Sequence, residues 1–204
     1  MGFVPEPQIT LQSGLLYNVV VDLLVCLVCY YASYVLYARG HEKKFSLFLF
    51  TLGSYWLAVG VGNVLLWTNH LAAFASIAYL LKFLLIIPAV FLMRYLSSLV
   101  FENKTSFRRI TALYNILALV YLLLTFQQDR DLYTVTYWGI QWQISTLPQL
   151  FYLWGMLLPI LILAIYLPLK NFIEGAIEKG KAGLYLPLGA AIFVLLEYTQ
   201  LSSP

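Results

Sequence analysis

Charged side chains are scarce in this sequence: Asp, Glu, Lys and Arg make up 10% of its 204 residues, whereas soluble domains carry about 25%. Apolar residues reach 62%, and the mean hydropathy is +0.82. These values exclude a soluble globular domain. Because the apolar residues fall in long runs without period-two alternation, they predict helices and exclude the strands of a membrane barrel. We therefore expect an all-α integral membrane protein.

Histidine and cysteine are nearly absent, with two residues of each. His41 lies among basic residues and His70 at an expected turn, so no pair of imidazoles inside the membrane is available for haem, copper or a di-iron centre. Cys26 and Cys29 share one face of one apolar run, and no second pair completes a zinc site. We interpret both as packing thiols and expect neither a metal nor another cofactor.

The sequence motifs of common enzymes are also absent. It contains no Gly-rich phosphate loop, no G-x-S-x-G elbow and no H-E-x-x-H pair. Enzymatic activity is therefore less expected, although membrane enzymes can use dispersed Asp, Glu and Tyr, and no catalytic residue is assigned. The net charge of +3 is confined to short loops, so it does not indicate nucleic-acid binding.

The apolar runs approach the roughly 20 residues that cross a membrane as a helix. They predict a polytopic bundle of six transmembrane helices in a single membrane domain, residues 1–204, over residues 14–38, 45–68, 71–96, 110–126, 148–169 and 183–201. The first fourteen residues are polar and lack Lys and Arg. We expect no cleavable signal peptide, so the first span remains as a helix.

Basic residues are concentrated in alternate loops. Ten of the twelve Lys and Arg residues follow the first, third and fifth spans; of the others, Arg130 lies on the opposite side and Lys82 inside a span. The positive-inside rule then places these three loops in the cytoplasm and both termini outside.

Ionisable side chains inside the spans are costly, at least about 2.5–3.5 kcal/mol each, and seldom face lipid. Asp22, Lys82 and Glu197 are such residues, and they lie with Asn63 toward the expected outer side. In a functional interpretation Asp22 and Lys82 form a buried ion pair beside a cavity open to the exterior. In a structural interpretation Lys82 has a packing partner, and Asp22 is protonated or bonds a neighbouring helix.

The expected external loop before the fifth span has an alternating pattern over residues 133–137 and 140–144, broken at Trp138 and Gly139. This pattern predicts a small β-hairpin on the membrane surface that caps the polar site. The alternative is an aromatic belt at the interface. The candidate binding residues are therefore Asp22, Asn63, Lys82, Trp138, Trp142 and Glu197.

Two further features indicate contacts with partners. The cytoplasmic loop 170–183 follows Pro168, which is expected where its helix ends, and has the pattern of an amphipathic surface helix suited to a membrane or cytoplasmic protein. Ala58 and Gly62 form a small-xxx-small pair, which is typical of packing within a bundle or of a homodimer face. The lipid bilayer is the remaining expected partner.

The order of these features is distinctive. The second span ends in WLAVGVGNVLLW, the third has Pro88 past its middle and RYLSS at its end, FRR opens the fourth, and TYWGIQWQ precedes the fifth. This order resembles the N-terminal seven-helix membrane region found ahead of the kinase core in a class of bacterial sensor histidine kinases. The resemblance implies a module of the bacterial inner membrane that senses an external or membrane-dissolved cue and passes a helix shift to a partner.

That family has a seventh helix leading to a cytoplasmic signalling domain, so we expect either a fragment of such a sensor or a stand-alone six-helix protein. The favoured function is a non-enzymatic sensor or input domain. The main alternative is an accessory subunit of a larger membrane complex. A small-solute transporter or channel is less favoured, because no halfway repeat is detected.

Overall fold

The computed structural model describes residues 8–40, 43–127, 133–136, 139–142 and 146–174. Within them, the helices are α1 (Gln8–Ala38), α2 (Lys43–Trp67), α3 (Leu71–Leu84), α4 (Ile86–Val100), α5 (Lys104–Phe126), α6 (Thr146–Phe151) and α7 (Leu158–Ile173), and a π-helical segment, η1 (Tyr152–Leu157), joins the last two. Strands β1 (Tyr133–Thr136) and β2 (Gly139–Trp142) pair antiparallel, with Tyr133 opposite Trp142.

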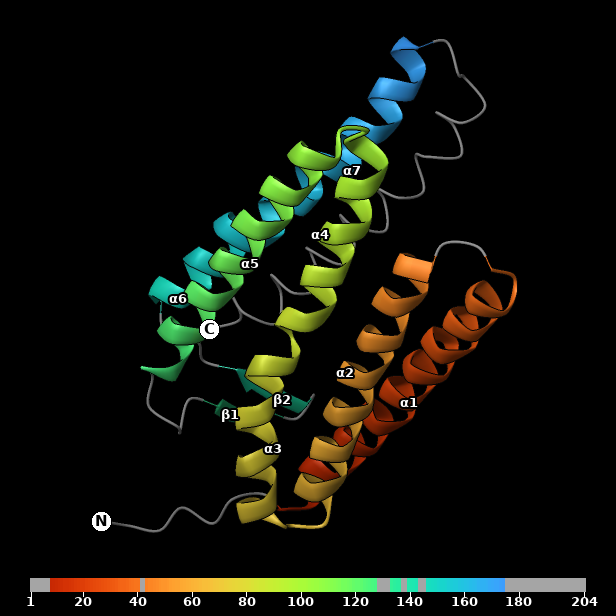
Figure 1. Cartoon of the computed structure of the whole chain (residues 1–204). Coiled ribbons are helices and arrows are strands. Elements are labelled where there is room, and N and C mark those ends of the chain that lie inside the picture. Colours follow the sequence, from red (N-terminus) through yellow and green to blue (C-terminus); the bar gives the residue numbers. More distant parts are fainter. Residues whose placement is uncertain (1–7, 41–42, 128–132, 137–138, 143–145, 175–204) are drawn as a thin grey trace.

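The helices form an elongated bundle in which α4 is central (Figure 1). Helices α1 and α2 lie side by side as an antiparallel hairpin, and α3 returns along α2. Helix α4 then contacts α2, α5 and α7. Its buried residues, among them Leu92, Met93 and Leu96, join the main apolar core together with Tyr114 and Tyr121 of α5.

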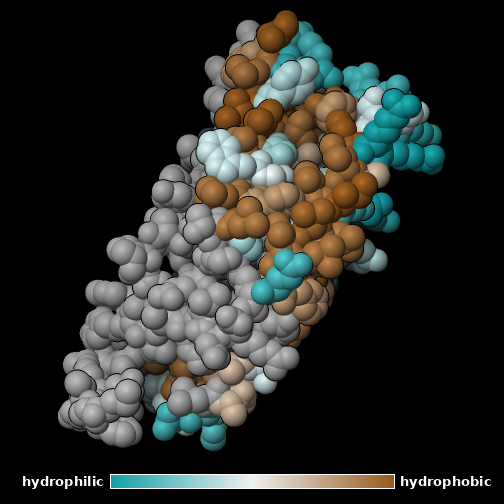
Figure 2. Space-filling view, turned by 90° about the vertical axis from the view of Figure 1, so that its left-hand side faces the viewer, coloured by the Kyte–Doolittle hydropathy of each residue, from teal (hydrophilic) through white to brown (hydrophobic). Residues whose placement is uncertain are grey.

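Four described helices are long and apolar enough to cross a membrane: α1 from Leu15, α2, α5 and the helix from Tyr152 to Ile173. Their outward faces are also apolar. Figure 2 shows such side chains over the face formed by α5 and α7, with hydrophilic residues gathered at the upper end. A contiguous apolar surface of this kind is rare on soluble monomers. The chain is therefore a multi-pass membrane protein built as a helical bundle.

Helices α1 and α2 cover the first two predicted spans, but the third differs. The single helix predicted over 71–96 is two helices, α3 and α4, that meet at Leu85. Pro88 explains the break: it has no N–H to donate to the carbonyl group of Leu84, four residues earlier, and its ring clashes with that group. The hydropathy of the run is continuous across the break, so the apolar pattern alone did not reveal it.

The fourth predicted span, 110–126, begins too late, because α5 starts at Lys104. Asn103 caps this helix, with its Oδ1 accepting a hydrogen bond from the Thr105 amide at 2.9 Å. Asn is among the best residues at this position. The basic residues expected in a loop, including Arg108 and Arg109, therefore lie in the first turns of the helix.

The fifth predicted span, 148–169, corresponds to α6, η1 and α7 together, and it continues to Ile173. The expectation that Pro168 marks the helix end is wrong: Pro168 is buried inside α7. A proline is tolerated there because neighbouring helices pack around it. The first residues of loop 170–183 extend α7. Residues 175–183 of that loop and the predicted span 183–201 lie outside the described residues.

The π-helical segment η1 precedes Pro159. The Leu158 amide bonds to the carbonyl of Leu153, five residues back, so the turn is widened where proline removes the next donor. The Tyr114 hydroxyl of α5 donates to the Met156 carbonyl at 2.9 Å in a buried position. This bond ties α5 to the irregular turn.

Replacing Tyr114 by phenylalanine removes the donor and leaves the Met156 carbonyl buried. We expect the free energy of unfolding to fall by about 1–3 kcal/mol, measured by titrating the protein from mild detergent into a denaturing one. Tyr166→Phe is the matched control, because Tyr166 is exposed on α7. Equal effects of the two substitutions would show that the hydrogen bond contributes nothing.

Candidate functional site

A hydrogen-bonded polar pair lies between the first two helices. The Asn63 amide nitrogen of α2 donates to Oδ2 of Asp22 of α1 at 2.8 Å, and both side chains are 4% exposed. Asp22 lies seven residues from Leu15, the start of the apolar part of α1, or about 10 Å along the helix. The pair is therefore inside the apolar segment but nearer to the end of the bundle that holds the α2–α3 turn.

Close approach of the two backbones makes this pair possible. A Cβ atom on Gly60 would lie 3.3 Å from the Asp22 Cβ, and one on Gly53 would lie 3.0 Å from the Tyr30 ring. Glycine at both positions lets α2 lie directly against α1. Gly62, one residue of the small-xxx-small pair expected from the sequence, instead faces Phe74 of α3.

Asn63 keeps one unused acceptor. No described residue donates to its Oδ1, although the atom is buried. An amide oxygen can accept two hydrogen bonds, and buried polar atoms of proteins are nearly always paired. The Asn63 oxygen is therefore a buried acceptor beside the Asp22 carboxyl whose hydrogen bonding is incomplete among the described residues.

The other predicted site residues are placed only in part. Lys82 lies on α3, which runs beside α2, but its side chain is not described. Trp142 belongs to β2, which lies next to α1. Trp138 and Glu197 are outside the described residues. The hydrogen bond between Asp22 and Asn63 of the neighbouring helix is the contact that the structural interpretation expected. The Asp22–Lys82 ion pair and the β-hairpin cap over the site stay predictions.

The opposite end of the bundle gathers the basic residues. Lys44, at the start of α2, lies 5.0 Å from the centre of the Phe107 ring in α5. Lys170 of α7 pairs with Glu102 before α5 at 3.2 Å and with Glu174 at 3.8 Å. The Lys- and Arg-bearing ends of α2, α5 and α7 therefore lie together at one end of the bundle.

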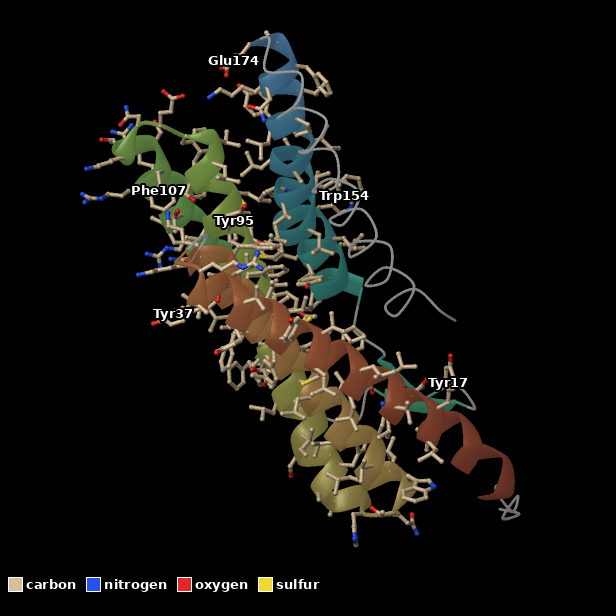
Figure 3. All side chains as sticks on the ribbon, turned by 90° about the vertical axis from the view of Figure 1, so that its right-hand side faces the viewer. Tyr17, Tyr37, Tyr95, Phe107, Trp154 and Glu174 are labelled. Carbon is tan, nitrogen blue, oxygen red and sulfur yellow. The ribbon has the colours of Figure 1, made fainter. Side chains whose placement is uncertain are left out.

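Tyrosines mark both ends of α1. Figure 3 shows Tyr17 and Tyr37 near opposite ends of the helix, with Tyr37 on the side of Phe107. The two are 67% and 66% exposed, and twenty residues of helix separate them by about 30 Å. This distance matches the thickness of a hydrocarbon core, and tyrosine favours both of its interfaces.

Two contacts between α1 and α2 were not predicted. The hydroxyl groups of Ser33 and Ser46 each donate to the backbone carbonyl of the other residue, at 2.8 and 2.9 Å. The hydroxyl oxygens of Tyr30 and Ser54 lie 3.1 Å apart. The serine pair had a sequence signal: the two residues lie almost equally far from Gly40, where the chain turns. Antiparallel helices bring such residues together.

The arrangement at Asp22 and Asn63 offers hydrogen bonding and charge rather than covalent chemistry. Among the described residues, no group of three His, Cys, Asp or Glu side chains is placed to hold a metal. Comparisons of the chain with known protein families, with curated proteins and with solved structures found no match.

Proposed function

We propose that this chain is a membrane input module with six transmembrane helices, external termini and its basic end in the cytoplasm of a bacterial cell. The observation that carries the proposal is the buried Asp22–Asn63 pair with its unused acceptor. A buried polar group in a membrane helix is costly and usually has a role. A cue that donates to this pair, or that changes its charge, alters how α1 packs on α2.

The α1–α2 hairpin is the route from this pair to the cytoplasmic end. Its helices are held together further along by the Tyr30–Ser54 and Ser33–Ser46 contacts. Beyond them, Lys44 touches α5 at Phe107. A small shift at Asp22 is thereby passed to α5, in the manner of helix shifts of about 1–2 Å at known interfaces. The partner that reads it docks on the cytoplasmic loop 170–183.

Spin labels at the basic end test this route. In a background with Cys26 and Cys29 replaced by alanine, labels replace the exposed residues Arg39 and Arg108, and pulsed electron resonance measures their separation in nanodiscs. Asp22→Asn keeps the size of the side chain and removes its charge. We expect it to shift or broaden the distance distribution by about 1–2 Å.

Asn115→Leu is the control, since it changes an exposed polar residue of α5 far from the pair. Identical distributions for the parent, Asp22→Asn and the control would refute the input function. Recovery of a fixed additional protein in mild detergent, with unchanged distributions, would instead support an accessory subunit.

A further inference from the structure

A second site lies on the lipid-facing side of the α1–α2 hairpin, near its basic end. It is an open groove of about 480 Å³, within the roughly 300–1,000 Å³ range of small-ligand sites. Its walls are Tyr30, Tyr34 and Tyr37 of α1 and Leu47 and Phe50 of α2, with Lys43 at one end. The polar pair at Asp22 is not part of it.

The polar groups at the floor of the groove and on Tyr30 already have partners. Ser33 and Ser46 lie buried at its floor and bond to each other through both hydroxyls. The Tyr30 hydroxyl is within 3.1 Å of Ser54, and its ring lies 5.3 Å from that of Phe50. The inner part of the groove therefore offers only aromatic and aliphatic surface to an occupant.

The outer part of the groove is polar and carries a positive charge. Lys43 and Tyr37 are exposed there, and none of the described acidic residues pairs with Lys43. From Lys43 to Phe50 the groove follows seven residues of helix, about 10 Å. One cationic end followed by 10 Å of apolar wall complements an amphiphile with an anionic head.

We infer that this groove binds an anionic phospholipid, with the phosphate at Lys43 and the upper part of an acyl chain along Tyr34, Leu47 and Phe50. The lipid is the source of the phosphate because the walls of the groove are mainly aromatic and aliphatic, the hydroxyls of Ser33, Ser46 and Tyr30 are already paired, and the exposed side chains Tyr34, Leu47 and Phe50 face away from the bundle core. The inference does not depend on the proposed input function.

Native mass spectrometry of the purified chain tests this site, with phosphatidylglycerol as the probe and phosphatidylcholine for comparison. A lysine near an anionic lipid surface contributes about 1 kcal/mol, which corresponds to an affinity change of about fivefold. We expect Lys43→Gln to weaken phosphatidylglycerol binding by that factor and phosphatidylcholine binding by less, because the choline cation of phosphatidylcholine offsets the charge of its phosphate. Tyr34→Ala, which opens one wall at an exposed residue, should weaken both lipids.

Lys44→Gln is the matched control, because it removes the same charge one residue away, where the side chain lies over Phe107 and not in the groove. It should bind phosphatidylglycerol as the parent does. Glycerol 3-phosphate, which has the phosphate without acyl chains, should not compete. Equal weakening by Lys43→Gln and Lys44→Gln, or no change in either, would overturn the site and leave only general attraction to the basic end.

Discussion

Replacing Gly53 by leucine is expected to force α1 and α2 apart and to destabilise the protein. Even a Cβ atom at this position would lie 3.0 Å from Cδ1 of Tyr30 and 3.1 Å from Cβ of Cys29. Overpacking of this kind costs about 1–3 kcal/mol and sometimes more. The midpoint of unfolding in a denaturing detergent should fall accordingly, with a smaller fall for Gly53→Ala.

Gly62→Ala is the control for this substitution. A Cβ atom there would lie 3.6 Å or more from Phe74 and Ile77 of α3, which is ordinary contact. Its unfolding midpoint should stay near that of the parent. If Gly53→Leu and Gly62→Ala unfold alike, the two helices do not pack as closely as described.

The second large effect is expected at the polar pair. Asn63→Leu removes the amide that bonds Asp22 and leaves the carboxyl group buried at 4% exposure. A buried acceptor without its donor costs about 1–3 kcal/mol, and more if it is charged. We expect the free energy of unfolding to fall by about 1–3 kcal/mol, and by more if the carboxyl group stays charged.

The double variant Asp22→Leu with Asn63→Leu separates this effect from simple packing. Replacing both partners by apolar groups of similar size is often nearly neutral. The double variant should therefore be more stable than Asn63→Leu alone. A double variant that loses as much as the sum of the single variants would show that the two residues do not interact.

Hydropathy identified the membrane class and the approximate position of most described helices, because the cost of burying charge applies to the whole length of a span. It did not locate helix ends. Helix α5 begins six residues before its apolar run, since Asn103 supplies a cap that hydropathy does not measure. The break at Leu85 likewise depends on the missing N–H of Pro88 and not on polarity.

Asp22 and Asn63 stand out in the sequence because polar residues are rare in apolar runs. The sequence does not reveal that these two residues pair. Their pairing depends on how α1 is rotated against α2, and Gly53 and Gly60 allow the close contact between the two helices. The reciprocal serine bonds also depend on that rotation. Spacing within one helix therefore predicts candidates, and packing between helices selects the partners.

The distance between Asp22 and Asn63 along the chain also bears on biosynthesis. Forty-one positions separate them, so Asp22 leaves the ribosome before its partner does. A lone carboxyl group enters lipid at a cost that α1 by itself does not relieve. We therefore expect α1 to be retained at the insertion channel until α2 has entered it, and the two helices to move into the bilayer together as a hairpin.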